Sequence, residues 1–431
     1  MDTNIIHTGD CFDVLTDLPD ESIHAVVSDP PYGLNFMPNV TNGWDDFEPK
    51  EYQEWCEKWA RECLRVLKPG GHMLAFSGNR THHRLFTGVE DAGFEIRDTL
   101  TWHYGSGFPK ASDISKTIDK RAGAEREVVG EKTAPDGVPL ADRVSHSGEE
   151  YDEESADYAD CKRDVYERAP ATDAAKKWDG WKTGLKPSTE FVVMARKPYD
   201  GATVDSVLEH GTGALNIEAC RIGDDKIKTN GWRQPDGNGM MQENVDAGVY
   251  SDTDYNGGTH QGRYPSNLMF DEVAADSLDS KNEHTVSDPS PRHNSEEAHN
   301  DSTKYGDASE GGWTTTGHSD SGGPSRYFYT SKATKAERTL DGKIDNAHPT
   351  VKPGDLMQWL VKLVTAENQI VLDPFCGSGT TLRAAKDLNR QFIGIERQAK
   401  WADVARVRAG LTPEDPSTVR DDAGQSGLEV Y

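Results

Sequence analysis

Short apolar stretches alternate with amphipathic stretches over the first hundred residues of the chain. Residues 23–27 (IHAVV) are almost continuously apolar, which predicts a buried strand. Apolar side chains then recur at steps of three and four residues from Tyr52 to Leu67, which predicts a helix that stops at Pro69. A strand over 72–76, a helix over 81–92 and a strand over 95–102 are predicted next. This order is typical of a parallel sheet covered by helices.

The same alternation returns near the other end of the chain. Apolar side chains between Leu356 and Val364 lie on one face of a predicted helix that starts after Pro353. A strand over 370–372, a helix over 380–388 and a strand over 392–395 are predicted to follow. One isolated strand is predicted in the middle of the chain, over 189–195 (TEFVVMA).

Between these two regions the periodic pattern disappears. Residues 105–189 are polar and include the acidic run 149–160, so we predict a loop with mobile parts. Residues 197–326 are rich in Gly, Asn, Asp, Ser and Thr, which fits either a substrate-reading insertion or a poorly ordered linker. The sequence predicts a catalytic domain in two halves, residues 1–125 and 326–410. Residues 126–325 between them are predicted to be a variable insertion and target-recognition region, which contributes the strand 189–195 to the catalytic sheet. Residues 411–431 are predicted to be an acidic tail.

The charge of the chain allows three interpretations. Its 431 residues include 47 Lys and Arg against 74 Asp and Glu, a net charge of −27. A disordered solvating chain, a protein that avoids polyanions and an enzyme adapted to concentrated salt all fit this charge. We favour a halophilic enzyme, because apolar periodicity survives at both ends and high salt screens the attraction to phosphates. Basic stretches at 110–126, 196–197 and 326–338 are either DNA contacts or solvated surface.

The cysteines and the apolar runs exclude several classes of protein. The six cysteines form no CxxC pair and show no zinc-ligand spacing with histidines, so neither a disulfide scaffold nor a metal site is predicted. No apolar run is long enough to cross a bilayer, and the residues after Met1 lack the order of a signal peptide. The sequence therefore predicts a soluble, cytoplasmic protein without a membrane partner.

A first motif with chemical meaning, Ser28-Asp29-Pro30-Pro31-Tyr32, directly follows the predicted strand 23–27. An exocyclic amine on a base is a poor nucleophile, because its lone pair is delocalised into the ring. Asp29 and the carbonyl of Pro30 can accept its two N–H protons, and consecutive prolines hold that carbonyl rigid. Tyr32 offers a flat ring for stacking an extruded base. The structural alternative is a Pro-Pro turn with a solvent-facing Asp.

A second motif, residues 371–380 (VLDPFCGSGT), runs from a strand through a glycine turn into a helix. Glycines let the backbone approach a ligand closely, and a helix N-terminus offers free N–H groups to a carboxylate. Glu396 ends the next strand, where nucleoside-binding sheets place a carboxylate for ribose hydroxyls. The sequence lacks both the GKS or GKT of a phosphate-binding loop and the GxGxxG of a dinucleotide-binding fold. The pattern therefore favours a nucleoside cofactor without a triphosphate.

The order of these motifs resembles that of the beta class of DNA amino-methyltransferases. The resemblance rests on DPPY at 29–32, HPTVKP at 348–353 and DPFCGSGT at 373–380, and covers roughly residues 1–125 and 325–410. The stretch 105–120 is similar to phage and prophage members in particular. The resemblance implies an α/β, Rossmann-like S-adenosylmethionine-dependent methyltransferase sheet, circularly permuted, with a long central insertion. In the implied sheet, the strand at Ile370 is followed by those at Phe392, Ile5 and Ile23.

The resemblance also implies roles for individual residues. The catalytic residues would be Asp29, Pro30, Pro31 and Tyr32. Glu396 would bind the ribose of S-adenosylmethionine, and Asp10 would lie near its adenine ring. Thr350 and Lys352 would meet its methionine carboxylate. The methionine part would be surrounded by Asp373, Phe375, Gly377 and Gly379, with Pro374, Ser378 and Thr380 in the same cofactor-binding turn.

The implied activity is methyl transfer from S-adenosylmethionine to N6 of adenine in double-stranded DNA, as in restriction-modification. Members with Asp before Pro-Pro-Tyr mostly modify adenine, and Asp29 fills that position. The alternatives are transfer to N4 of cytosine, methylation of RNA or of a protein amide, and an inactive DNA-binding homologue. Transfer is predicted to be direct, without a covalent intermediate or a metal. A cognate restriction nuclease, an orphan or viral enzyme without one, and a homodimer all remain open.

Overall fold

The computed structural model describes residues 1–34, 45, 47–105, 107, 111–133, 166–232, 255–282, 285–286, 291–292, 315–316, 321–331, 339 and 351–415. The chain forms two compact units, one of residues 1–106 and 188–431 and the other of residues 107–187. Within the described ranges, no helix is both long and apolar enough to cross a membrane.

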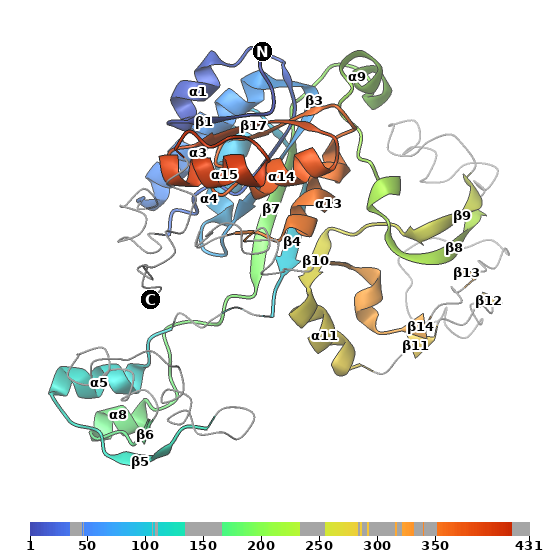
Figure 1. Cartoon of the computed structure of the whole chain (residues 1–431). Coiled ribbons are helices and arrows are strands. Elements are labelled where there is room, and N and C mark those ends of the chain that lie inside the picture. Colours follow the sequence, from blue (N-terminus) through green and yellow to red (C-terminus); the bar gives the residue numbers. More distant parts are fainter. Residues whose placement is uncertain are drawn as a thin grey trace. The chain divides into compact units, whose positions relative to one another are not determined.

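A nine-stranded sheet forms the centre of the larger unit (Figure 1). In spatial order its strands are β1 (Ile5–Thr8), β17 (Gln391–Glu396), β16 (Ile370–Asp373), β2 (Ile23–Ser28), β3 (Leu67–Ser77), β7 (Thr189–Arg196), β4 (Glu95–His103), β10 (Leu268–Asp271) and β15 (Tyr329–Ser331). β7 runs antiparallel to both of its neighbours, whereas all other pairs in this sheet are parallel. The predicted α/β, Rossmann-like fold is confirmed.

The N-terminal and C-terminal strands of the chain meet in this sheet. β1 pairs with β17, with Ile5 opposite Ile393, and β17 pairs with β16. The predicted neighbourhood of these three strands is confirmed. The predicted place of the next strand is wrong, because β2 lies on the other side of β16, with Val26 opposite Leu372. A central place suits β2, whose side chains are nearly all buried, whereas β1 has the partly exposed pattern of an edge strand.

Helices cover both faces of the sheet. One layer contains α1 (Cys11–Asp17), α3 (Pro49–Val66) and α4 (His82–Asp91), and the other contains α13 (Gly354–Val364), α14 (Thr380–Asp387) and α15 (Ala399–Arg408). Alternate residues of β3 pack against the two layers. Met73 and Ala75 join the core under α3 and α4, whereas Leu74 and Phe76 join the core under α13 and α14. The sheet is therefore the middle layer of a three-layer domain.

The start of α3 contains its own capping signals. The backbone N–H of Glu48 donates to the carboxylate of Glu51, and Pro49 is the first helical residue. The helix ends at Val66, before the predicted stop at Pro69. The early end arises because Leu67 is already extended and lies opposite Ile23 of β2.

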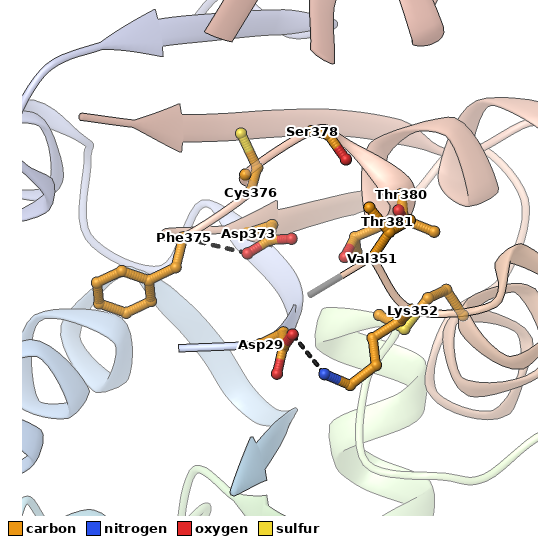
Figure 2. Close-up of a pocket in the computed structure, with 11 residues that line it drawn as sticks. Asp29, Val351, Lys352, Asp373, Phe375, Cys376, Ser378, Thr380 and Thr381 are labelled. Atoms are coloured by element: carbon orange, nitrogen blue, oxygen red, sulfur yellow. Dashed lines mark hydrogen bonds and ion pairs between the residues drawn. The ribbon is translucent and has the colours of Figure 1, made fainter. Parts of the chain in front are cut away.

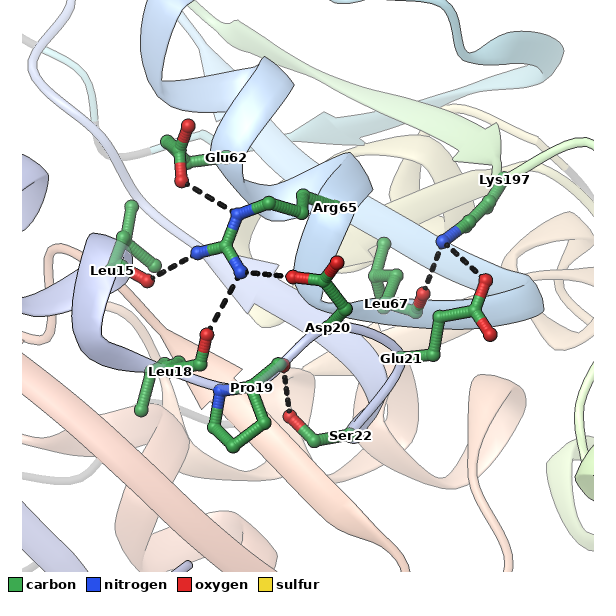
Figure 3. Close-up of polar contacts among 10 residues, drawn as sticks. All are labelled: Leu15, Leu18, Pro19, Asp20, Glu21, Ser22, Glu62, Arg65, Leu67 and Lys197. Carbon is green, nitrogen blue, oxygen red and sulfur yellow. Dashed lines mark hydrogen bonds and ion pairs between the residues drawn. The ribbon is translucent and has the colours of Figure 1, made fainter.

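Arg65, near the end of α3, ties this helix to α1 (Figure 3). Its guanidinium donates to the carbonyls of Leu15 (2.7 Å) and Leu18 (2.8 Å), which lie at the end of α1. It also pairs with Asp20 at 2.5 Å and Glu62 at 2.9 Å. Cationic side chains near a helix C-terminus satisfy carbonyls that have no partner within the helix. These contacts fix the turn that leads from α1 into β2.

The smaller unit is regular where the sequence predicted a loop, so that prediction is wrong for its described residues. It contains α5 (Ile114–Ala122), α8 (Asp173–Lys177) and a pairing of β5 (Val128–Glu131) with β6 (Tyr166–Arg168). Buried Asp119 accepts hydrogen bonds from Arg126 at 2.7 Å and from the N–H groups of Ala171 and Thr172 at 3.0 Å. Because polar contacts organise this unit, apolar periodicity does not reveal it. The acidic run 149–160 lies outside the described residues.

Residues 197–326, described in part, contain more regular structure than their composition indicates. Their helices and strands are α9 (Thr203–His210), η1 (Glu218–Cys220), β8 (Ile222–Trp232) paired with β9 (Tyr255–Arg263), β10, α11 (Glu272–Ser280), β11 (Thr285–Val286) paired with β14 (Ser321–Gly322), β12 (Pro291–Arg292) paired with β13 (Thr315–Thr316), and η3 (Pro324–Tyr327). β10 pairs with β4, with Met269 opposite Trp102, so this segment extends the main sheet.

Candidate active site

The carboxyl ends of β2 and β16 lie side by side, because the two strands are adjacent and parallel. Ser28, the last residue of β2, donates its hydroxyl to the carboxylate of Asp373, the last residue of β16, at 2.5 Å. Asp29 therefore lies at the same edge of the sheet as the turn after Asp373. A pocket at this edge (Figure 2) is lined by Asp29, Val351, Lys352, Met357, Asp373, Phe375, Cys376, Gly377, Ser378, Thr380 and Thr381. The structure thus brings the two motifs of the sequence together.

Two glycines with positive φ shape the turn after β16. Gly379, at φ +82°, caps the start of α14, and a Cβ added there would lie 2.8 Å from the Cβ of Ala405. Gly377, at φ +50°, donates its N–H to the carboxylate of Glu396 at 3.0 Å. Such angles favour glycine, because a Cβ strains the backbone there. The turn is therefore closely packed and is joined to the end of β17.

Arg408 of α15 fixes the same turn from the protein interior. Its side chain is buried, and its guanidinium donates to the carbonyl (2.8 Å) and hydroxyl (2.9 Å) of Ser378 and to the hydroxyl of Thr380 (3.0 Å). A buried guanidinium is costly unless its donors find partners, so these contacts restrict the turn. The sequence analysis missed Arg408, because a basic residue late in the chain gives no distinguishing signal.

Two carboxylates flank the turn, buried Asp373 and partly buried Glu396. Burial raises the pKa of Asp373 to about 6, although hydrogen bonds from Ser28, Thr381 and the N–H of Phe375 favour its charged form. Burial also raises the pKa of Glu396 to about 6. Both groups are predominantly ionised at neutral pH and make this side of the pocket negative. Buried carboxylates with perturbed pKa values are concentrated at functional sites.

Asp29 belongs to a cluster of four side chains, with Tyr32, Glu190 and Lys352. The Nζ of Lys352 lies 2.5 Å from Oδ2 of Asp29 and 3.4 Å from Oε2 of Glu190. The hydroxyl of Tyr32 lies 2.8 Å from Oδ1 of Asp29, 3.2 Å from Oε2 of Glu190 and 3.2 Å from the Nζ of Lys352. Each member therefore contacts at least two others.

Lys352 lines the same pocket, and its ammonium points to Asp29 (Figure 2). Its implied contact with the methionine carboxylate stays a prediction. Burial lowers the pKa of Lys352, but the carboxylates of Asp29 and Glu190 outweigh this effect and raise it. The ammonium is therefore charged at neutral pH. Thr350, the other residue implied at that carboxylate, lies outside the described residues.

The antiparallel direction of β7 explains how Glu190 reaches this cluster. Glu190 is the second residue of β7, and its neighbour Phe191 lies opposite Ser77 at the end of β3. The beginning of β7 therefore shares an edge with the carboxyl ends of the parallel strands. The sequence analysis missed Glu190, although a lone carboxylate at the start of an apolar strand was a signal, because buried charges need partners.

The Pro-Pro-Tyr segment, residues 30–32, contacts α3 and the other members of the Asp29 cluster. Pro30 is buried, and the carbonyl of Pro31 accepts a hydrogen bond from the hydroxyl of Tyr52 at 2.9 Å. Burial and the neighbouring carboxylates raise the pKa of Tyr32 well above its usual value, so its hydroxyl stays protonated. Tyr52 therefore fixes the backbone at Pro31, while the carboxylates of Asp29 and Glu190 fix the hydroxyl of Tyr32.

Two residues implied at the cofactor lie at the margins of this arrangement. Asp10 follows β1 and caps α1 by accepting a hydrogen bond from the N–H of Phe12 at 3.0 Å. The ring of Phe375 points away from Asp29 (Figure 2) and packs against Trp55 and Trp59, with centroid distances of 5.3 and 5.4 Å. Asp10 does not line the pocket described above, whereas Phe375 contributes to it.

Comparisons with known proteins identify the family. The profile of the N6/N4 DNA methylase family matches residues 23–406. The Type II methyltransferase M.HindIII of Haemophilus influenzae is 24% identical over 441 residues, which cover 94% of this chain and 95% of that protein. M.HinfI, also of Haemophilus influenzae, is 40% identical over 89 residues, 21% of this chain and 25% of that protein. Among solved structures, the cytosine-N4-specific PvuII DNA methyltransferase has a TM-score of 0.44 at 14% identity, covering 95% of this chain and 86% of its own. Because the profile spans most of the sequence, the chain belongs to the N6/N4 DNA methylase family.

Proposed function

We propose that this DNA methylase transfers a methyl group from S-adenosylmethionine to N6 of adenine at a specific site in double-stranded DNA. The observation that carries the proposal is the meeting of Asp29 with Gly377 and Ser378 of the glycine turn in one pocket. Methyl transfer to an amine needs an acceptor for the amine protons within reach of the cofactor. The adjacent ends of β2 and β16 supply both at one edge of the sheet.

The residues of the turn fit S-adenosylmethionine. The carboxylate of Glu396 accepts backbone N–H groups of Gly377, Arg397 and Gln398. A carboxylate has about four lone-pair sites, so one stays for a ribose hydroxyl. Asp373, together with Glu396, makes the surroundings negative, which suits a sulfonium cation. When bound, S-adenosylmethionine supplies an electrophilic methyl group. We assign its methionine part to Asp373, Phe375, Gly377 and Gly379, with Pro374, Ser378 and Thr380 beside them.

Asp29 and the carbonyl of Pro30 are the proposed acceptors for the two N–H protons of the target amine. Hydrogen bonds to both protons concentrate the lone pair on nitrogen, so the amine becomes a better nucleophile. Tyr32 is the proposed stacking surface for the extruded base. Catalysis then rests on positioning and electrostatics and needs no covalent bond to the protein. Adenine is favoured over cytosine because Asp, and not Ser, precedes Pro30.

The test is to incubate the full chain with methyl-labelled S-adenosylmethionine and plasmid DNA, and to identify the modified nucleoside by mass spectrometry. The expected product is N6-methyladenine. Asp29→Ala should abolish turnover and leave the affinity for S-adenosylmethionine nearly unchanged, while Asp91→Ala, which removes an exposed carboxylate on α4, should retain full activity. N4-methylcytosine as the product would refute the assignment of the base. Turnover by Asp29→Ala would refute the role of Asp29.

A further inference from the structure

The contacts of Asp29 conflict with its proposed role. Its Oδ2 lies 2.5 Å from the ammonium of Lys352, and its Oδ1 accepts the hydroxyl of Tyr32. A carboxylate paired this closely with a cation is a weaker acceptor for another donor, because the cation already stabilises its negative charge. An amine that approaches Asp29 therefore competes with Lys352.

Lys352 cannot simply leave Asp29 for water, because its side chain is only 8% exposed. A buried ammonium that loses its counterion is strongly unfavourable, since neither water nor another charge compensates it. The ammonium therefore needs a second anionic partner close by. Among the described residues, Glu190 is the other carboxylate that pairs with it, at 3.4 Å.

Glu190 is fixed independently of Asp29. It lies on β7 and is opposite Trp102 of β4, whereas Asp29 follows β2. Movement of the ammonium from one carboxylate to the other therefore requires a change in the lysine side chain and no change in the sheet. The hydroxyl of Tyr32, within hydrogen-bond distance of both carboxylates and of the ammonium, can keep a bond in either arrangement.

We infer that Glu190 is a positioning residue for methyl transfer, which takes over the ammonium of Lys352 when Asp29 engages the target amine. This inference rests on the proposed role of Asp29 as an acceptor. Glu190 frees Asp29 by holding the lysine and does not itself touch the reacting atoms. It also keeps the pocket from containing an unpaired buried cation during the reaction.

A double-mutant cycle tests this inference, with kcat measured at saturating DNA and S-adenosylmethionine. In the parent protein, Glu190→Gln should lower kcat on the order of 10²-fold, the effect of a misplaced reacting group. Its KM for S-adenosylmethionine should not change. In a Lys352→Met background, the same substitution should lower kcat less than about threefold, because no ammonium then has to be held away from Asp29. The matched control Glu95→Gln removes a carboxylate that pairs with Arg196 on β7 and should leave kcat unchanged.

The pH dependence gives a second readout, which also serves if Lys352→Met has too little activity to measure. The titratable groups that interact with the ammonium are Asp29, Glu190, Tyr32 and Tyr104, and Asp373 lines the same pocket. Without Glu190, the pKa of Lys352 falls, so a rise in pH discharges the lysine and releases Asp29. The deficit of Glu190→Gln should therefore shrink as the pH rises and the lysine loses its charge.

Two outcomes would overturn the inference. One is an equal loss of kcat from Glu190→Gln with and without Lys352, and the other is a deficit that does not change with pH. Either outcome in a protein whose parent form methylates adenine would refute the role of Glu190 and leave the proposed function intact. A parent protein that binds S-adenosylmethionine and methylates no DNA would refute the proposed function itself.

Discussion

The substitution Asp373→Asn should stabilise the unliganded protein at neutral pH while it weakens cofactor binding. Asp373 is only 2% exposed, and burial raises its pKa from an ordinary value of 3.8 to about 6. Asparagine has a similar shape, and its carbonyl oxygen can still accept from Ser28 and from the N–H of Phe375. The variant therefore removes the buried negative charge and retains much of the hydrogen bonding.

The magnitude follows from the linkage between protonation and folding. One pKa unit corresponds to about 1.4 kcal/mol, so the shift of Asp373 corresponds to roughly 3 kcal/mol. Well below pH 4 the group is protonated in both the folded and the unfolded state, and its charge has no effect on stability. Between pH 4 and pH 6 the unfolded state loses its proton first, so the parent protein loses stability as the pH rises. Asp373→Asn does not titrate, so its advantage over the parent should grow by roughly 3 kcal/mol across this window.

The assay is the free energy of unfolding from urea titrations of both proteins at pH 4 and pH 7.5, followed by tryptophan fluorescence. Asp276→Asn, a change at an exposed position on α11, is the control and should give the same small difference at both pH values. Calorimetric titration should show that Asp373→Asn binds S-adenosylmethionine less tightly than the parent. The reasoning fails if the stability difference between Asp373→Asn and the parent is the same at pH 4 and pH 7.5.

Three further predictions concern the support of the pocket. Gly379→Ala should lower the free energy of unfolding by about 2 kcal/mol and weaken cofactor binding, because the added Cβ would lie 2.8 Å from the Cβ of Ala405. Thermal unfolding and titration with S-adenosylmethionine test these two effects. Tyr52→Phe should lower kcat without changing the affinity for S-adenosylmethionine, because it removes the hydrogen bond to the carbonyl of Pro31. Equal losses of kcat and of cofactor affinity would contradict this expectation. Asp119→Asn should speed proteolysis within 107–187 and leave the affinity for S-adenosylmethionine unchanged, since the contacts of Asp119 lie inside that unit.

The parts of the fold that apolar periodicity marks could be predicted from the sequence. The strands at 23–27, 189–195 and 392–395 all lie in the central sheet. Their central side chains are buried on both faces, and that burial is what produces a continuous apolar run. The exact neighbour of β2 was not predictable in the same way, because two different sheet orders bury the same residues. Only the register, with Val26 opposite Leu372, distinguishes them.

The two motifs of the candidate site were predictable for a different reason. Asp29 and the turn at 377–379 each follow a strand directly, so the rule that ligands bind at the carboxyl ends of parallel strands applies to both. The roles of these residues stay predictions, whereas their meeting in one pocket is a finding. The rule did not predict Glu190, because β7 runs antiparallel to its neighbours. The beginning of β7 therefore lies at the edge of the sheet where the parallel strands end.

The residues that the sequence did not reveal have one physical property in common. Glu190, Arg408 and Asp119 are polar groups whose partners come from distant parts of the chain, as in the pair of Arg408 with Ser378. A buried apolar residue can be recognised in the sequence because further apolar residues follow at steps of two in a strand or four in a helix. This repeat arises because a whole face of the strand or helix is buried. A buried charge has no such repeat, because its few partners lie at irregular distances along the chain. In a chain with 74 acidic residues, most carboxylates that the fold encloses therefore resemble the solvated majority, and only a special position, such as that of Glu190 at the start of an apolar strand, gives a signal.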